Sequence, residues 1–430
     1  MDVLVGLMGC GTVGAGVVEL VRLRREKIAR LTGRRPAIRR ILVRDPAKPR
    51  SVPVDPSLFT MRAEDILDDP HIDIVIETIG GIEPARTYIL AALRAGKHVV
   101  TANKDLMALY GTELLEAAAA AGADLMYEAA VGGAIPLIRP LKESLAADEI
   151  TDIRGIVNGT TNYILSKMTD TGADLDTVLR EAQALGYAEA DPSSDVDGWD
   201  AARKLVILAS LAFHAPVRLD EVQVQGIRSI AAADVAYAQE LGCVIKLIAC
   251  GSNRGGRLVL SVRPTLVPKD HPLAHVGDAY NALFVRGDAA GNLMFYGRGA
   301  GSLPTASAVL GDLIDVLRNM SLNASGFPHP VCLRRLPVAP EAAPPQRHYI
   351  RMTVVDRPGV FARIAGLFGQ AEVSMATVLQ KRVHDGRAEI VIVTHEVAQE
   401  QLRRAVDAAA ALEAVDAVHN VLPLETEAAG

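Results

Sequence analysis

The first 31 residues constrain the fold most strongly. An apolar run at 3–8, "VLVGLM", leads directly into the glycine-rich stretch "GCGTVG", and residues 14–31 then show helical apolar periodicity. In a strand–turn–helix setting, G-x-G-x-x-G allows a tight turn, close approach of the backbone to a pyrophosphate and close helix packing. The first helix amides then face the anion. We therefore expect dinucleotide binding by Gly9, Gly11, Thr12, Val13 and Gly14.

Strands and helices alternate as far as about residue 130. Further strands are predicted at 37–43, 73–80, 97–102 and 124–129. Short apolar strands separated by helices form a parallel sheet covered on both faces. The predicted class is therefore α/β, with a Rossmann-type dinucleotide-binding domain at 1–130. A helix predicted at 303–317 could return to it, so that this domain also includes about 303–320.

The remaining chain divides into three further parts. Residues 131–302 contain longer alternating strands and Gly-containing turns, which predict an α+β substrate-binding domain. We also expect this domain to carry the catalytic residues and a dimerisation surface. Residues 321–347 are proline-rich and aperiodic, as is typical of a linker. Residues 348–430 show a βαββαβ order with an Asp385-Gly386 hairpin signal, which predicts a ferredoxin-like domain.

Composition narrows the class of function. Only 4% of the residues are aromatic and the net charge is −6, which argues against nucleic-acid binding. The four cysteines include no Cys-x-x-Cys pair, so neither a disulfide framework nor a zinc ribbon is indicated. No apolar run approaches the roughly 20 residues that span a bilayer, and the chain begins without a basic leader. We expect a cytoplasmic enzyme with small substrates, and neither a nucleic-acid nor a membrane partner.

The segment after the second predicted strand bears on the choice of cofactor. It reads "LVRDPAKPR" and contains Arg44, Asp45, Lys48 and Arg50. Several cations suit a 2′-phosphate, which favours NADP(H), whereas Asp45 could hold a ribose diol and keeps NAD(H) open. The alternative is that Arg44 is only a solvated turn residue.

A second ligand-binding stretch is predicted where the fourth strand ends, in "TANKDLMA". Thr101 and Lys104 would lie at the carboxyl edge of the sheet, where doubly wound folds bind ligands. Lys104 could meet the cofactor, the substrate carboxylate or only solvent.

An acidic stretch precedes an apolar helix in the middle of the chain. Residues 189–200 carry five carboxylates, of which Glu189 is the first and Asp200 the last, and Lys204 follows one helical turn later. The spacing does not fit a calcium loop. A solvated loop with an ordinary i,i+4 ion pair would explain the charges alone. However, the helix after Lys204 is predicted to be buried, which would partly remove the lysine from water. This favours a pocket in which carboxylates bind an ammonium group and Lys204 transfers a proton.

Taken together, these stretches resemble the homoserine dehydrogenase family. "GYAEADPSSDVDGWDAARK" is similar to the family pattern G-Y-x-E-x-D-P-x-x-D-x-x-G-x-D-x-x-x-K. The blocks "GLMGCGTVGAGVV", "TANKDLMALYG", "YEAAVGGAIPLI", "GIVNGTTNYIL" and "GAGSLPTASAVLGDL" are also similar, so the resemblance covers residues 1 to about 320. It implies a monofunctional enzyme that interconverts L-homoserine and L-aspartate 4-semialdehyde with NAD(P)(H), in threonine, methionine and isoleucine biosynthesis.

The resemblance also implies roles for individual residues. Lys204 would be the acid and base, with Asp200 and Lys104 as further catalytic residues. Hydride transfer to an aldehyde develops alkoxide charge, which a neighbouring cationic acid stabilises. The substrate would be bound by Glu189, Asp195, Asp200 and Thr160, and the cofactor by Lys104 and Gly301, in addition to Arg44 and Thr101, which are predicted from their positions alone.

A monovalent cation site and a regulatory domain are implied as well. Na⁺ or K⁺ would be held by Glu128, Val131, Gly133 and Ile135, although this stretch could simply be a glycine turn between domains. "DRPGVFARIAGLF" resembles an ACT domain, which implies an amino-acid effector, expected to be threonine. The alternative is a dimerisation module without a ligand. We expect a homodimer or homotetramer.

Two other functions stay open at this point. A related NAD(P)-dependent reductase could act on another amino aldehyde. A non-catalytic amino-acid sensor could keep the nucleotide fold, but the presence of Glu189, Asp200 and Lys204 argues against it.

Overall fold

The computed structural model describes residues 2–322, 324, 334–382 and 385–425. The chain forms two compact units. The first comprises residues 1–150, 203–221 and 281–336, and the second comprises residues 151–202, 222–280 and 337–430. Within the described ranges, no helix is both long and apolar enough to cross a membrane.

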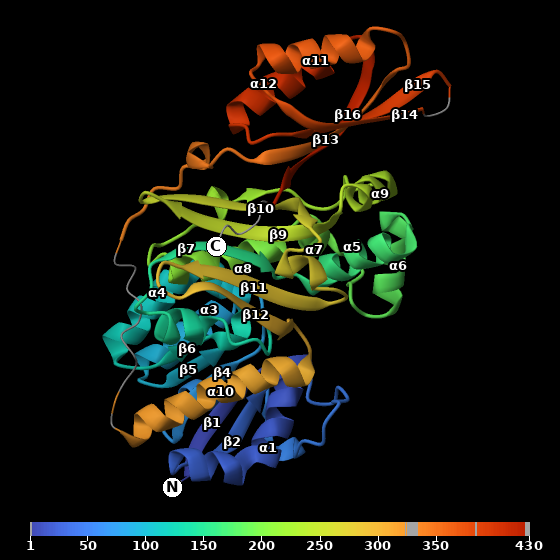
Figure 1. Cartoon of the computed structure of the whole chain (residues 1–430). Coiled ribbons are helices and arrows are strands. Elements are labelled where there is room, and N and C mark those ends of the chain that lie inside the picture. The colour runs from blue at the N-terminus through green and yellow to red at the C-terminus, as the bar shows by residue number, and fades with distance from the viewer. Residues whose placement is uncertain (1, 323, 325–333, 383–384, 426–430) are drawn as a thin grey trace. The chain divides into compact units, whose positions relative to one another are not determined.

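The first unit is built on a parallel sheet with the strand order β3-β2-β1-β4-β5-β6 (Figure 1). This confirms the predicted α/β class. The unit contains β1 (Asp2–Met8), α1 (Thr12–Thr32), β2 (Arg35–Leu42), β3 (Phe59–Thr60), α2 (Glu64–Leu67), β4 (Ile72–Glu77), α3 (Ala85–Arg94), β5 (His98–Thr101), α4 (Lys104–Ala121), β6 (Leu125–Met126), β11 (Tyr280–Gly287), β12 (Gly291–Arg298) and α10 (Ser302–Ser321).

Helices α1 and α10 pack together although about 270 residues separate them. Val17 and Val21 share one buried apolar cluster with Val309 and Leu313. At the start of α10, the Ser302 hydroxyl donates a hydrogen bond to the carbonyl of Thr12 (2.7 Å). The end of α10 that begins with Ser302 therefore lies beside the glycine-rich loop.

Two strands of the parallel sheet differ from the prediction. The edge strand β3 was not predicted, because two residues are too few to show a hydrophobic period. The strand predicted at 124–129 is only Leu125–Met126, since Glu128–Ala130 form a short 3₁₀ helix.

The second unit contains the other strands. Its strand order is β7-β9-β10-β16-β13-β15-β14, and β8 pairs with β10. The elements are β7 (Ile150–Ile156), α5 (Gly159–Thr171), α6 (Leu175–Ala184), α7 (Ser193–Val196), β8 (Gln223–Val224), α9 (Ala232–Glu240), β9 (Cys243–Arg254), β10 (Arg257–Pro268), β13 (Arg347–Val355), α11 (Val360–Gln370), β14 (Met375–Arg382), β15 (Arg387–Thr394), α12 (Gln399–Ala410) and β16 (Val415–Leu424). Helix α8 (Trp199–Ala212) carries the chain from this unit into the first.

Residues 347–424, called the C-terminal module below, have the predicted βαββαβ order. Helices α11 and α12 cover one face of its sheet (Figure 1). Ile364 and Phe368 of α11 pack with Ile390 and Ile392 of β15 in a buried core. Strands β14 and β15 pair in antiparallel fashion, as the hairpin signal predicted.

The predicted linker is partly structured. Residues 323 and 325–333, which include Pro328 and Pro330, lie outside the described residues. Nearer the C-terminal module, Leu258 of β10 donates a hydrogen bond to the Pro337 carbonyl (2.9 Å) and accepts one from the Ala339 amide (2.8 Å).

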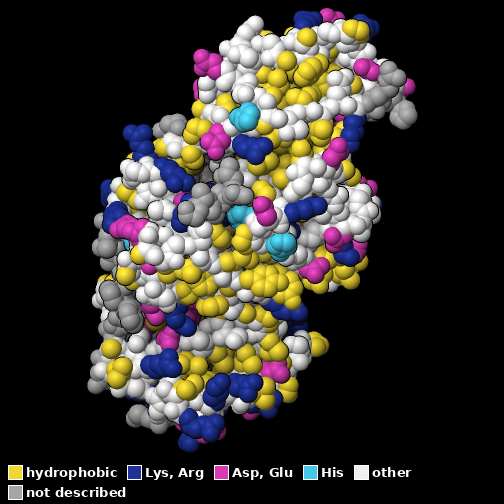
Figure 2. All heavy atoms as spheres, viewed as in Figure 1, with side chains coloured by type: hydrophobic (Ala, Val, Ile, Leu, Met, Phe, Trp, Pro, Cys, Tyr) yellow, Lys and Arg dark blue, Asp and Glu magenta, His cyan; other side chains and the backbone are white. Residues whose placement is uncertain are grey.

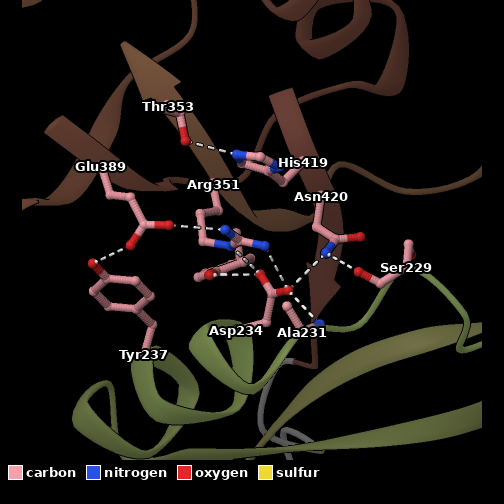
Figure 3. Close-up of polar contacts among 10 residues, drawn as sticks. Ser229, Ala231, Asp234, Tyr237, Arg351, Thr353, Glu389, His419 and Asn420 are labelled. Carbon is pink, nitrogen blue, oxygen red and sulfur yellow. Dashed lines mark hydrogen bonds and ion pairs between the residues drawn. The ribbon is translucent and has the colours of Figure 1, made fainter. Parts of the chain in front are cut away.

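A buried carboxylate joins helix α9 to the C-terminal module (Figure 3). Asp234 accepts hydrogen bonds from Arg351 Nε (2.6 Å) and Nη2 (3.0 Å). It also accepts from the Tyr349 hydroxyl (3.0 Å), Asn420 Nδ2 (2.8 Å) and the Ala231 amide (2.9 Å). The charge of Asp234 is thus matched by a guanidinium, and polar donors fill its remaining positions.

Candidate active site

The glycine-rich loop has a backbone that side chains would not fit. Gly9 has a φ of +100°, and a Cβ there would lie 2.7 Å from the Thr78 carbonyl oxygen. A Cβ on Gly14 would lie 2.2 Å from the Gly9 carbonyl oxygen. Gly11 is exposed with open space around it, which leaves its backbone accessible to a ligand. These are the three glycine roles expected of a pyrophosphate-binding turn.

A cavity of about 960 Å³ opens beside this loop within the first unit. Gly9, Gly11 and Thr12 line it, whereas Val13 and Gly14 do not. The segment after β2 also lines it, with Arg44, Asp45, Lys48 and Arg50. The loop and the cationic segment, which were predicted separately, therefore meet in one cavity.

The side chains of the cationic segment are not equivalent. Arg50 donates a hydrogen bond to the Asp45 carbonyl (2.7 Å), and its guanidinium lies 5.2 Å from the centre of the Phe59 ring. The Asp45 carboxylate accepts from the Ala47 amide (2.8 Å), so it stabilises its own turn. Arg44 is exposed and makes no hydrogen bond or ion pair with the described residues. Its guanidinium can therefore turn toward a ligand.

Thr101 is buried and does not line the cavity. Its hydroxyl donates to Glu77 Oε2 (2.5 Å) and accepts from the Asn103 amide (3.0 Å). Glu77 Oε1 in turn accepts from the amides of Ile79 (2.7 Å) and Gly80 (3.0 Å), both of which line the cavity. Glu77 was not predicted as a site residue. The sequence signal that could have identified Glu77 is a carboxylate at the end of a buried strand, directly before "TIGG".

The two candidate catalytic lysines lie next to a shared ion pair. Lys104 begins helix α4 and is half-buried, and Lys204 is half-buried in α8. Arg203 Nε lies 3.2 Å from a carboxylate oxygen of Asp105. Because these two residues adjoin Lys204 and Lys104, the segments that carry the lysines touch.

Helix α8 is buried beyond Lys204, as predicted. Leu205 and Leu208 are 1% and 0% exposed, and Phe213, which follows the helix, is 2% exposed. Lys204 thus stands where a polar segment enters an apolar core.

The acidic stretch is organised by a residue that was not predicted. Asn158 Nδ2 donates to Asp195 Oδ1 (2.7 Å) and to Asp200 Oδ2 (2.8 Å). Asn158 Oδ1 accepts from the amide of Thr161 (2.8 Å), which makes Asn158 the N-cap of α5. An asparagine before "GTTN" at a helix start was the signal that could have identified it.

Two other predicted substrate residues make contacts outside this cluster. The Thr160 hydroxyl donates to the Tyr187 carbonyl (2.7 Å). Glu189 is exposed, and its main-chain oxygen accepts from Gln183 Nε2 (3.0 Å). The structure therefore joins Asp195 and Asp200 through Asn158, but it does not add the Glu189 carboxylate to that contact.

The segment predicted to bind a cation, residues 127–138, is buried apart from residues 134 and 136. Its one acidic side chain, Glu128, forms hydrogen bonds within the protein. Glu128 Oε1 accepts from the amides of Leu137 (2.6 Å) and Ile138 (2.9 Å), and Oε2 accepts from that of Arg139 (2.8 Å). The Glu128 amide donates to Asp312 (2.8 Å). Burial raises the pKa of Asp312 to about 8, and the negative charge of Glu128 adds to this increase. A cation would therefore meet main-chain carbonyls here, while the Glu128 carboxylate stabilises the loop.

Two glycines of the first unit hold unusual backbone positions. Gly133 has a φ of +56°, and a Cβ there would lie 2.6 Å from the Gly299 carbonyl carbon. Gly301 has a φ of +130° and precedes α10, whose first residue Ser302 contacts Thr12. The predicted Gly301 turn is therefore next to the glycine-rich loop.

The visible surface shows no single basic face. In Figure 2, Lys and Arg are spread in small groups over the drawn face, with Asp and Glu among them.

Three features together define an NAD(P)-dependent oxidoreductase. They are the glycine-rich dinucleotide turn, the cavity lined by the cationic segment, and the acidic stretch followed by Lys204, whose segment meets that of Lys104. Three family descriptions match the chain in sequence order. "Homoserine dehydrogenase, NAD binding domain" covers residues 9–128, "Homoserine dehydrogenase" covers 136–314 and "ACT domain" covers 348–414. The chain belongs to the homoserine dehydrogenase family.

Individual relatives agree over nearly the whole length. The homoserine dehydrogenase of Bacillus subtilis is 45% identical over 92% of each chain. That of Corynebacterium glutamicum is 46% identical over 98% of this chain and 96% of its own. The crystal structure of a homoserine dehydrogenase from Thiobacillus denitrificans is 42% identical, with a TM-score of 0.92 over 99% of this chain and 98% of that one. A hyperthermophilic archaeal homoserine dehydrogenase in complex with NADPH is 28% identical, with a TM-score of 0.63 over 74% of this chain and 98% of that one.

Proposed function

We propose that this homoserine dehydrogenase interconverts L-homoserine and L-aspartate 4-semialdehyde with Lys204 as the acid and base. The observation that carries the proposal is the Arg203–Asp105 ion pair, which brings the segment of Lys204 to that of Lys104. Half-burial at the start of a buried helix gives Lys204 the partly desolvated setting that an acid–base lysine needs.

The residue roles follow the direction of the reaction. Bound NADPH or NADH supplies the hydride for reduction of the aldehyde. The Lys204 ammonium donates a proton to the aldehyde oxygen during reduction, and the neutral amine accepts it back during oxidation. Asp200, one turn earlier on α8, positions Lys204 and contributes to the substrate site. Lys104 contributes to cofactor binding and proton transfer.

The substrate ammonium group is bound by carboxylates in this proposal. Asp195 and Asp200 are held together by Asn158, and Glu189 lies on the same connecting stretch. Thr160 would contact the substrate from the first turn of α5.

The cofactor is NADP(H) in preference to NAD(H) in this proposal. The exposed Arg44 and the neighbouring Lys48 and Arg50 would meet a 2′-phosphate in the cavity, and a relative is known in complex with NADPH. The glycine-rich loop, with Val13 and Gly14 behind its surface, would hold the pyrophosphate. Thr101 would act through the loop that it orders, and Gly301 would lie near the nicotinamide.

A monovalent cation would have a structural role. Glu128 and the main-chain carbonyls of residues 131, 133 and 135 would hold it, because hard oxygen donors suit Na⁺ or K⁺. The Glu128 carboxylate would support this loop from its three amide contacts.

Domain limits and assembly complete the proposal. The dinucleotide domain would comprise 1–130 with 303–320, the substrate domain 131–302, the linker 321–347 and the ACT domain 348–430. We propose a homodimer or homotetramer in the cytoplasm, with the ACT domain binding threonine as a feedback inhibitor. Gly359, with a φ of +87°, forms the turn before α11 where such a ligand could meet backbone groups.

One assay tests the central proposal. The purified full chain is given L-homoserine with NADP⁺ or NAD⁺, and reduced cofactor is followed by absorbance for the wild type and for Lys204→Ala. We expect higher kcat/KM with NADP⁺ than with NAD⁺. In the variant, we expect kcat to fall by a factor of ~10²–10⁴ while the KM for cofactor changes little.

The outcomes separate the alternatives. No turnover of homoserine with turnover of another amino alcohol would favour the related reductase. No turnover of either, with amino-acid binding retained, would favour a sensor. A Lys204→Ala variant that keeps most of its kcat would remove Lys204 from the mechanism.

The same assay tests regulation. We expect threonine to inhibit the wild type, and Gly359→Ala to weaken that inhibition, because a side chain strains a backbone with positive φ. Gly366, in the helix that follows Gly359, does not have a positive φ and has open space around it. Gly366→Ala therefore serves as the matched control. Equal inhibition of all three proteins would place the effector site elsewhere.

A further inference from the structure

The Asn158 side chain contacts two carboxylates of the acidic stretch at once. Its amide nitrogen lies 2.7 Å from one carboxylate and 2.8 Å from another, on Asp195 and Asp200. We propose that Asn158 is a positioning residue that holds these two carboxylates side by side as the receptor for the substrate ammonium group. This inference rests on the proposed function of the acidic stretch.

The need for a neutral double donor follows from electrostatics. Two carboxylates within reach of one nitrogen repel each other, most strongly where water is limited, and Asp200 is only 5% exposed. A carboxamide offers two N–H donors without adding charge, so it can bridge both anions and leave their negative charge in place. A lysine or arginine in its position would bridge them too, but it would neutralise the charge that attracts the substrate.

The orientation of the amide is fixed from its other end. Asn158 Oδ1 accepts from the amide and from the hydroxyl of Thr161, both at 2.8 Å. A flipped amide would turn its oxygen toward two carboxylates and its N–H groups toward the donor amide of Thr161. Only the observed orientation satisfies every partner.

Asn158 also links three elements whose relative placement sets the site. It caps α5, Asp195 belongs to α7, and Asp200 lies in the first turn of α8. Asn158 is 4% exposed, so bulk water does not readily replace its contacts. Loss of its donors should let the two carboxylates separate, which would weaken binding of the substrate ammonium more than binding of the cofactor.

The replacement Asn158→Asp isolates this role. Aspartate is as good an N-cap as asparagine, so the contact with Thr161 is kept. The two N–H donors are lost and a third carboxyl faces Asp195 and Asp200, while Thr161 adds no charge from α5. We expect the KM for L-homoserine to rise at least tenfold at pH 8, with the KM for cofactor within about twofold of the wild type.

The pH dependence of the KM for homoserine distinguishes the proposed positioning role from a general structural role, which would not change with pH. As the pH falls, the introduced carboxyl takes up a proton and can donate to one of its neighbours. The ratio of variant to wild-type KM for homoserine should therefore decrease between pH 9 and pH 6. Asn158→Ser, which keeps a cap and one donor, should give a smaller rise in KM with no such trend.

The control removes a cap elsewhere. Asp174 caps α6 through the Thr177 amide (2.8 Å), and Asp174→Ala should leave the KM for homoserine unchanged. A wild-type KM in Asn158→Asp, or a KM ratio independent of pH in a folded variant, would overturn the positioning role. If Asn158→Asp does not fold, a wild-type KM in Asn158→Ser would do the same. Absence of homoserine oxidation in the wild type would instead overturn the proposed function.

Discussion

The second unit contains two carboxylate clusters that are built in different ways. At the junction with the C-terminal module, Asp234 is matched by the guanidinium of Arg351. At the acidic stretch, Asp195 and Asp200 are joined by the neutral amide of Asn158. In the first arrangement, a cation of the protein itself neutralises the Asp234 carboxylate, as is typical of a structural contact. The second joins two like charges through a neutral donor, and we propose that this pair of carboxylates receives the substrate ammonium group.

The electrostatics of the Asp234 junction support its structural role. Burial works to lower the pKa of Arg351, but its hydrogen bonds to Asp234 and Glu389 outweigh burial and raise that pKa. Burial and a hydrogen bond to Glu389 raise the pKa of Tyr237 to about 12. These groups therefore keep fixed protonation states over the physiological range.

The largest expected effect comes from breaking the Asp234 junction. Arg351→Met would leave Asp234 and Glu389 without the guanidinium that pairs with both. We expect the free energy of unfolding to fall by about 3–5 kcal/mol, because a buried charge loses its partner. Urea unfolding followed by circular dichroism measures this.

The surface pair Arg387–Asp416 of the same module is the control. The Arg387 side chain is 51% exposed, so Arg387→Met should lower the free energy of unfolding far less than Arg351→Met does. Equal losses in the two variants would contradict a special role for the Asp234 junction.

An intermediate effect is expected from pH. Burial, followed by the charge of Arg263, lowers the pKa of His348 to about 4. Its folded-state pKa is below the ordinary value of about 6.5, so its stabilising contribution is complete above that value and is lost as pH falls toward 4. From pH 7 to pH 5, this single group should lower the free energy of unfolding by about 2 kcal/mol.

The variant His348→Gln should show a correspondingly weaker dependence of stability on pH. His395 is exposed, and His395→Gln should keep the wild-type dependence. Identical pH profiles for the wild type and His348→Gln would show that His348 is not held neutral by the fold.

The smallest effect is expected beside the acidic stretch. Arg228 forms an ion pair with Asp197, but the two side chains are 54% and 36% exposed. We expect Arg228→Met to lower the free energy of unfolding by less than about 1 kcal/mol, measured by the same urea titration. A loss as large as that of Arg351→Met would mean that the acidic stretch, too, is held by internal charge pairing.

Much of the fold could be predicted because it depends on local patterns. The turn at Gly9, the helix after Lys204 and the βαββαβ order of the C-terminal module each follow from short periodic segments. The two-residue strand β3 could not be predicted, because its pairing with β2 depends on distant contacts rather than on its own sequence.

The site was predicted less completely, and for a related reason. Lys204 and Asp200 share one helical face, so local spacing relates them. Asn158 lies about 40 residues earlier, and the sequence does not show that its amide reaches Asp200. Glu77 is similar, since its contact with Thr101 joins the ends of neighbouring strands. Polar contacts between distant segments become visible only once the chain has folded.

The contrast between the two clusters is tested most directly by substrate selectivity. The compound 4-hydroxybutanoate has the alcohol and carboxylate of L-homoserine but lacks its ammonium group. If the acidic stretch recognises that group, kcat/KM with NADP⁺ should be at least about a hundredfold higher for L-homoserine than for 4-hydroxybutanoate. Comparable values for the two compounds would contradict the account, because the paired carboxylates would then have no part in binding substrate.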